Sequence, residues 1–113
     1  MNNAGILLPA APNEWLTKDD FSKILNVNLI GLIEVTLSLL PLIRRTRARV
    51  VNVSSPAGRA FLFVGGYCIS KYGVEAFSSS LRYSPTSEED LTLAKSAFVN
   101  GEPGFLICRW QLK

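Results

Sequence analysis

The stretch that decides the fold runs from Val50 to Leu81 and reads VVNVSSPAGRAFLFVGGYCISKYGVEAFSSSL. Its first part, Val50 to Ser55, is apolar and rich in β-branched side chains, which is typical of a buried strand in a parallel sheet. Pro56 and Gly58 end this strand, and a pair of glycines then precedes a segment with helical spacing. We therefore predict a strand over residues 50–55, a long loop, and a helix over residues 67–82.

A second helix is predicted upstream, from Thr17 to about Arg45. Thr17 and Asp20 resemble a capping box, in which two residues satisfy each other's backbone N–H groups. Apolar residues follow at helical spacing, and the stretch from Ile24 to Ile43 is long enough to span a bilayer. Because polar residues and a proline interrupt it, we favour a buried helix and expect no membrane span.

Two asparagines and a glycine, Asn26, Asn28 and Gly31, lie inside this predicted helix. Glycine costs about 1 kcal/mol in a helix interior relative to alanine, and asparagine competes for backbone hydrogen bonds. Local rules broken inside a strongly periodic segment often mark a functional position. Small residues also allow close packing against a sheet, so both interpretations stay open.

The composition fits one small globular domain and excludes several kinds of site. The chain has 113 residues, of which 48% are hydrophobic and 19% charged, with a net charge of +3. This charge does not by itself indicate a nucleic-acid partner. The arginines between Arg44 and Arg49 fit a solvated helix end better than a patch for anionic lipid or nucleic acid. The chain has no histidine, which excludes the usual Ser-His-Asp and Cys-His triads and argues against a metal site.

The order of the predicted elements indicates an α/β fold, namely a partial Rossmann-like, doubly wound parallel sheet. Ligands in such sheets bind beyond the carboxyl ends of the strands. Ser55 lies at such an end, and so does the turn from Asn2 to Gly5. We therefore expect these two positions to border a binding site.

Tyr67 and Lys71 are four residues apart and share one face of the predicted helix. A tyrosine has an ordinary pKa of about 10, and a cation beside it favours the phenolate. A phenolate can take a proton from a substrate hydroxyl while hydride leaves for a nicotinamide, and Ser55 can hold the same oxygen. Taken singly, such a pair is more often a surface pair, and such a serine more often shapes a turn. The combination of Ser55, Tyr67 and Lys71 favours a catalytic site.

Four motifs occur in the order used by the short-chain dehydrogenases/reductases: NNAG at residues 2–5, VNL at 27–29, VNVSS at 51–55 and YCISK at 67–71. The chain resembles this family over residues 1–82, and residues 83–113 form a divergent tail. Within the family it is similar to the branch of retinol dehydrogenases and 17β-hydroxysteroid dehydrogenase type 6. The resemblance implies NAD or NADP as the cofactor and a retinoid or hydroxysteroid as the substrate.

The resemblance also assigns roles to single residues. It implies that Asn28 holds a water on a proton relay and that Ser55 orients the substrate. It implies that Tyr67 is the acid and base, and that Lys71 binds the nicotinamide ribose and lowers the tyrosine pKa. The cofactor-binding residues that it implies are Asn3, Ala4, Gly5, Tyr67 and Lys71.

The sequence departs from the family pattern at both ends. No T-G-x-x-x-G-x-G turn precedes Asn2, and in the family this turn holds the cofactor phosphates. We therefore expect the N-terminal half of the Rossmann domain to be lacking. The membrane helix of this endoplasmic-reticulum branch is also expected to be lacking, which favours the cytoplasm. In the tail we predict a short helix from Ser87 to Phe98 and a strand over residues 105–110.

Two functions stay open from the sequence. The first is an NAD(P)-dependent oxidoreductase that acts on the alcohol or carbonyl group of retinoids or hydroxysteroids. The alternative is a catalytically inactive fragment that associates with other subunits, as a homo-oligomer, through residues 17–45 and 67–82. The resemblance implies the association, because the matching helices form subunit contacts in many relatives.

Overall fold

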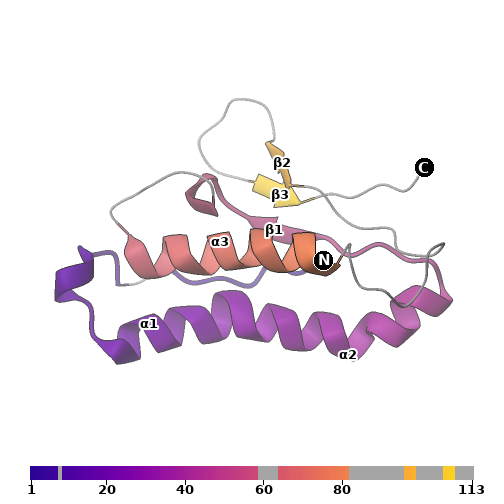
Figure 1. Ribbon diagram of the computed structural model, residues 1–113, viewed down its shortest axis with the longest axis horizontal. Helices are drawn as coiled ribbons and strands as arrows, with labels where there is room; N and C mark the ends of the chain where they lie inside the picture. The colour runs from indigo at the N-terminus through magenta and orange to yellow at the C-terminus, as the bar shows by residue number, and fades with distance from the viewer. Residues whose placement is uncertain (8, 59–63, 82–95, 99–105, 109–113) are drawn as a thin grey trace.

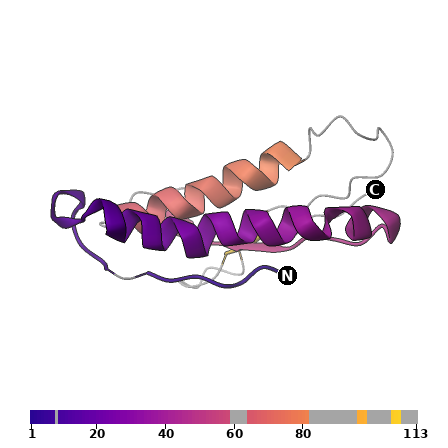
Figure 2. The same cartoon turned by 90° about the horizontal axis from the view of Figure 1, so that it is seen from below.

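The computed structural model describes residues 1–7, 9–58, 64–81, 96–98 and 106–108. The longer helices are α1 (Lys18–Leu25), α2 (Gly31–Arg45) and α3 (Gly65–Ser80). Shorter helical turns are η1 (Asn13–Trp15), η2 (Asn26–Ile30) and η3 (Pro56–Gly58), and the strands are β1 (Asn52–Ser54), β2 (Ser96–Phe98) and β3 (Leu106–Cys108). Figure 1 shows α3 running beside α1 and η2, which it contacts, and Figure 2 shows residues 1–7 and β1 on one side of the helices. The chain therefore combines helices with strands, as the predicted α/β class requires.

The predicted long helix is present as a continuous rod made of α1, η2 and α2. The capping box is confirmed: the Asp20 backbone N–H donates to Thr17 Oγ1 over 3.3 Å, and the Thr17 N–H donates to Asp20 Oδ2 over 2.9 Å. Thr17 Oγ1 also donates to Asp20 Oδ2 over 2.7 Å, and the two hydrogen bonds that Asp20 Oδ2 accepts, from the Thr17 N–H and from Thr17 Oγ1, hold the pKa of the Asp20 carboxyl below its usual value. The rod becomes π-helical at η2, where the sequence placed Asn26 and Asn28 in a helix interior. Such π-helical turns occur frequently at functional sites.

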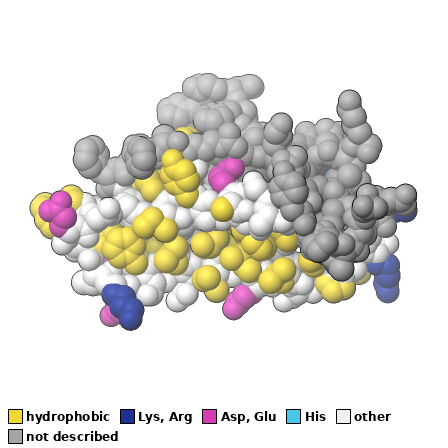
Figure 3. Space-filling model, viewed as in Figure 1, with side chains coloured by type: hydrophobic (Ala, Val, Ile, Leu, Met, Phe, Trp, Pro, Cys, Tyr) yellow, Lys and Arg dark blue, Asp and Glu magenta, His cyan; other side chains and the backbone are white. Residues whose placement is uncertain are grey.

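The rod has a buried inner face and an exposed outer face. The inner face carries buried side chains four residues apart, namely Ile24, Asn28, Leu32 and Thr36. The outer face, taken as the rest of the rod's circumference, carries apolar side chains that are 39–51% exposed, namely Val27, Ile30, Val35, Leu37, Leu39 and Leu42. Figure 3 shows apolar side chains gathered along this rod. The prediction of a buried helix is therefore correct for one face only.

The rod also meets the length and composition of a membrane span. It covers 28 residues, and its most apolar window has a mean hydropathy of 1.7 with 22% of that window buried. Core helices of soluble proteins meet the same criteria, so the rod is only weak support for a span.

The strands correct the predicted sheet. The order is β1-β3-β2 and both pairs are antiparallel, with Val53 and Ala97 each opposite Ile107. Within the part of the chain that the structure describes, parallel pairing is present as one bridge on β1, where the Asn2 N–H donates to Val51 O and the Val53 N–H donates to Asn2 O. Only residues 99–105 connect β2 to β3, and this is too short for the crossover that a parallel pair requires.

The tail accounts for two of these strands. The strand predicted over residues 105–110 is confirmed at Leu106–Cys108. The predicted helix from Ser87 to Phe98 is wrong at its end, because Ser96–Phe98 is a strand that pairs with β3. The rest of that predicted helix lies outside the described residues.

A chain of polar side chains crosses the interior between the two helices. Asn2 Nδ2 donates to Thr36 Oγ1 on α2 over 3.0 Å and to Asn52 Oδ1 on β1 over 2.8 Å. Asn52 Nδ2 then donates to Ser78 Oγ on α3 over 3.0 Å. Thr36, Asn52 and Ser78 are all buried, so these hydrogen bonds satisfy polar atoms that water does not reach.

Candidate active site

Tyr67 and Lys71 lie one turn apart near the start of α3, as their spacing predicted. The Lys71 Nζ atom lies 5.6 Å from the centre of the Tyr67 ring. Lys71 is only 5% exposed, and its Nζ donates to the Val53 carbonyl of β1 over 3.0 Å. A buried ammonium needs such an acceptor, so β1 holds the cation beside the tyrosine ring.

Asn28 is fully buried and is presented inward by the π-helical turn η2. Its Oδ1 accepts from the Ile6 N–H over 2.7 Å, and its Nδ2 donates to Ile6 O over 2.8 Å. The same Nδ2 donates to Ser70 Oγ over 3.0 Å. Both amide hydrogens of Asn28 are therefore engaged. The predicted role of Asn28 in holding a water stays a prediction, and the amide N–H groups are not available for it.

Gly5 lies where Asn28 and Lys71 come together. A Cβ atom at Gly5 would lie 3.5 Å from Asn28 Oδ1 and 3.7 Å from Lys71 Nζ. The two predicted site residues therefore flank the same point of the N-terminal segment, although one belongs to η2 and the other to α3.

A pocket of about 180 Å³ opens beside this point. Four of the five predicted cofactor-binding residues line it, and β1 contributes Val53 and Ser54. Its full lining is Asn3, Gly5, Ile6, Leu7, Val53, Ser54, Tyr67 and Lys71. The structure thus gathers at one pocket residues that the sequence separates by up to 68 positions.

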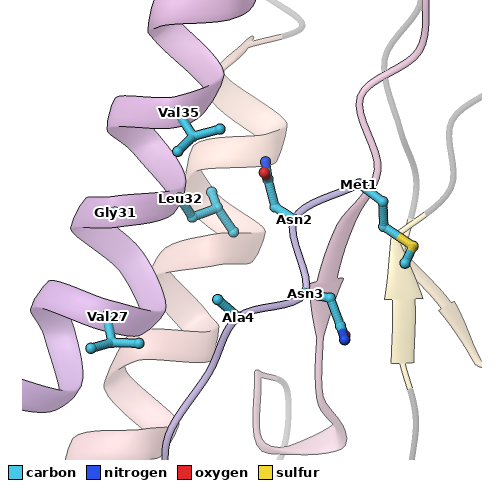
Figure 4. Close-up of a pocket in the computed structure, with 8 residues that line it drawn as sticks. All are labelled: Met1, Asn2, Asn3, Ala4, Val27, Gly31, Leu32 and Val35. Carbon is cyan, nitrogen blue, oxygen red and sulfur yellow. The ribbon is translucent and has the colours of Figure 1, made fainter.

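Ala4, the fifth predicted cofactor-binding residue, lines a second pocket of about 310 Å³. Figure 4 shows this pocket between residues 1–4 and the rod, with Val27, Leu32 and Val35 on the helical side. Asn3 lines both pockets, so the extended N-terminal segment forms the wall that they share.

Ser55 follows β1 directly, as predicted, but its side chain is used locally. Ser55 Oγ accepts from the Ala57 N–H over 3.3 Å, which is the contact of a turn-forming serine. Ser55 is not among the lining residues of the Tyr67 pocket, and among the described residues no hydrogen bond joins it to Tyr67. Its role in orienting a substrate stays a prediction.

Gly58 brings the turn after β1 against α3. Its N–H donates to Ser55 O over 2.8 Å. A Cβ atom at Gly58 would lie 2.8 Å from Ser54 Oγ and 3.0 Å from the Lys71 carbonyl, closer than real Cβ contacts. Any larger residue would therefore push η3 away from the helix that carries Tyr67 and Lys71.

Three contributors to the site were not predicted from the sequence. Val53 and Ile6 act through backbone atoms, which leave no signal in a sequence. Ser70 acts through its hydroxyl, and the available signal was its place between Tyr67 and Lys71 on a helix that packs against polar residues of the rod.

Comparison with known proteins identifies the family. The sequence profile described as short chain dehydrogenase matches residues 1–88. The chain belongs to the short chain dehydrogenase family. Retinol dehydrogenase 16 from Mus musculus is 60% identical over 107 residues, which cover 95% of this chain and 32% of that protein. Its counterpart from Homo sapiens is 76% identical over 82 residues, which cover 73% of this chain and 26% of that protein.

The similarity extends to a steroid enzyme of the same branch. The 17-beta-hydroxysteroid dehydrogenase type 6 from Homo sapiens is 65% identical over 82 residues, covering 73% of this chain and 26% of that protein. The predicted branch of this short chain dehydrogenase is therefore confirmed. The chain spans 26–32% of the length of these relatives.

Solved structures agree with this assignment. A short chain dehydrogenase/reductase from Saccharomyces cerevisiae superposes with a TM-score of 0.72 and 25% identity, covering 80% of this chain and 35% of that one. Serine dehydrogenase from Escherichia coli superposes with a TM-score of 0.67 and 28% identity, covering 73% and 39%. A closed form of serine dehydrogenase has been solved in complex with NADP+, and it superposes with a TM-score of 0.68.

Proposed function

We propose that this chain carries the proton-transfer part of an NAD(P)-dependent oxidoreductase that acts on the alcohol or carbonyl group of a retinoid or hydroxysteroid. The observation that carries the proposal is the buried Lys71 ammonium, held by Val53 O and 5.6 Å from the centre of the Tyr67 ring, at a pocket lined by Asn3 and Gly5. The names of the similar relatives, retinol dehydrogenase and hydroxysteroid dehydrogenase, support the substrate class.

In this proposal, the Tyr67 hydroxyl exchanges a proton with the oxygen of the substrate. The Lys71 cation favours the negative charge that Tyr67 carries when its proton is on the substrate, because opposite charges attract strongly where water is excluded. Val53 O keeps that cation in place. Ser55, at the carboxyl end of β1, orients the substrate oxygen by a hydrogen bond.

The described residues fit one end of a dinucleotide. Ligand sites for molecules of drug size occupy roughly 300–1,000 Å³, whereas the Tyr67 pocket measures about 180 Å³. Lys71 and Asn3 offer donors to a ribose hydroxyl, and Gly5 has no side chain to block the approach. When bound, NAD(P)+ accepts the hydride that leaves the substrate carbon. The NADP+ complex of serine dehydrogenase supports this cofactor class.

The test places residues 1–82 of this chain into human retinol dehydrogenase 16 in exchange for the matching segment. Formation of reduced cofactor is followed with NAD and NADP on retinol, a hydroxysteroid and a short-chain alcohol, and the 113-residue chain is assayed in parallel. We expect oxidation of retinol or the hydroxysteroid and little oxidation of the short alcohol. An exchange protein that folds and binds cofactor but oxidises none of them would refute the proposal. If the exchange protein is active and the 113-residue chain is not, the 113-residue chain on its own is an inactive fragment.

A further inference from the structure

We propose that Ser70 is a positioning residue that fixes the first turn of α3, and with it Tyr67, against Asn28 and the N-terminal segment. The inference rests on the proposed function of the Tyr67 pocket. It concerns the geometry of that pocket and names a residue that contacts neither substrate nor cofactor in the proposal.

The contacts of Ser70 connect three elements. Ser70 is fully buried, and its Oγ donates to the Tyr67 carbonyl over 2.7 Å. The same Oγ accepts from Asn28 Nδ2 over 3.0 Å, and Asn28 is bound on both sides to the backbone of Ile6. Removing the hydroxyl would leave a buried amide hydrogen of Asn28 without its acceptor, which is a costly change. The position of the α3 backbone at Tyr67 is therefore tied to η2 and to the N-terminal segment.

A second contact of the same kind lies two turns further along α3. Ser78 Oγ accepts from Asn52 Nδ2 over 3.0 Å, also in a buried site. Ser78 follows Ser70 by eight residues. Thr36 follows Asn28 by eight residues, and it is linked to Asn52 because Asn2 donates to both. The two serines thus hold α3 at two points along its length. Only the Ser70 contact involves the turn that carries the Tyr67 ring.

The position of this turn decides how well Tyr67 meets a substrate. A shift of α3 by one residue along its axis moves every group on it by about 1.5 Å. A misplacement of about 1 Å in a catalytic group can lower the rate roughly a hundredfold. Loss of the Ser70 contact is therefore expected to lower kcat.

The experiment compares Ser70→Ala with Ser78→Ala in the 113-residue chain. Both variants remove a buried hydroxyl of α3 that accepts from an asparagine Nδ2 over 3.0 Å, so they are matched in chemistry. The reporter is the NMR shift of the Lys71 side-chain protons, because Nζ lies 5.6 Å from the Tyr67 ring centre and is held by Val53 O of β1, so that a movement of the ring relative to β1 changes the ring-current displacement. We expect this displacement to decrease in Ser70→Ala and to be retained in Ser78→Ala.

A second variant and a rate measurement complete the test. Ser70→Cys keeps the size of the side chain with a weaker hydrogen-bonding group, and it should give a smaller loss of the displacement. In the turnover assay of the exchange protein, Ser70→Ala should lower kcat roughly tenfold or more, and Ser78→Ala less than about twofold. Equal Lys71 shifts in Ser70→Ala and Ser78→Ala would overturn the positioning role. Absence of Tyr67-dependent turnover in the parent protein would instead refute the proposed function, while the NMR comparison still decides the role of Ser70.

Discussion

The two faces of the α1–α2 rod differ from the usual arrangement of a helix in a small domain, because polar side chains alternate with apolar ones on the buried face and apolar side chains are exposed on the other. The inner face buries Asn28 and Thr36, and each side chain makes hydrogen bonds to another element. The outer face leaves Val35, Leu37 and Leu39 about half exposed. Hydrogen bonds are directional, so the inner face sets where residues 1–7 and α3 lie. The outer face does not fix the position of another element in this way, and it offers apolar area for association.

Exchanging residue types between the two faces should have the largest effect on stability. Asn28→Leu leaves the Ile6 N–H and the Ile6 carbonyl without this partner and removes the donor to Ser70 Oγ, and we expect it to lower the free energy of unfolding by about 3 kcal/mol. Leu37→Asn changes an exposed residue of the outer face and should cost less than about 0.5 kcal/mol. Urea unfolding followed by circular dichroism measures both. Equal costs would show that the inner polar contacts do not hold the fold.

Local spacing predicted the parts of the molecule that depend on neighbouring residues. The capping box at Thr17, the extents of the helices and the meeting of Tyr67 with Lys71 are of this kind. Periodicity also showed which residues of the rod share a face. It did not show that the face with Asn28 lies inside, because a pattern of period 3.6 does not state which side meets the rest of the chain.

Contacts between distant segments could not be predicted in the same way. The antiparallel pairing of β3 with β1 joins residues 106–108 to residues 52–54, and neither segment specifies its partner. The acceptor of Lys71 is a backbone carbonyl, which any residue at position 53 would provide. Ser55 was assigned from its place at the end of a predicted strand and by resemblance, and the structure uses its hydroxyl to shape the turn at Ala57.

The outer face should make the chain associate with itself, which is the second largest effect we expect. Val35, Leu39 and Leu42 follow at intervals of four and three residues, so they form one exposed apolar stripe on α2. Leu39→Asp should weaken self-association about tenfold, which corresponds to about 1.4 kcal/mol. Sedimentation velocity at several concentrations measures the change.

Leu37→Asp is the matched control for this prediction, because it adds the same charge to an equally exposed leucine that lies about 160° around the helix from Leu39, outside the stripe. It should leave the association constant nearly unchanged. A parent chain that sediments as a monomer at every concentration, or equal effects of the two variants, would remove the outer face as an interface.

The smallest effect is expected at the N-terminus of the rod, at the capping box formed by Thr17 and Asp20. Because Thr17 lowers the pKa of the Asp20 carboxyl, this contact contributes stability above the unfolded pKa of about 3.9 and loses it as the pH falls through the lower, folded value. The midpoint temperature of thermal unfolding should decrease from neutral to acidic pH, and this decrease should be smaller in Thr17→Ala than in the parent chain. Asp19→Asn, outside the capping box, should keep the decrease of the parent chain. An identical acid dependence in the parent and in Thr17→Ala would contradict the assignment.

The central claim is that the Tyr67 hydroxyl, beside the buried Lys71, transfers the proton in a dehydrogenase reaction. The most direct measurement is the rate of reduced-cofactor formation in the exchange protein with Tyr67→Phe, compared with Tyr72→Phe on the exposed side of the same helix. Loss of a positioned acid or base typically costs roughly 10²–10⁴ in rate. We predict a loss of this size for Tyr67→Phe and no comparable loss for Tyr72→Phe. A Tyr67→Phe protein that keeps the parent rate would contradict the claim.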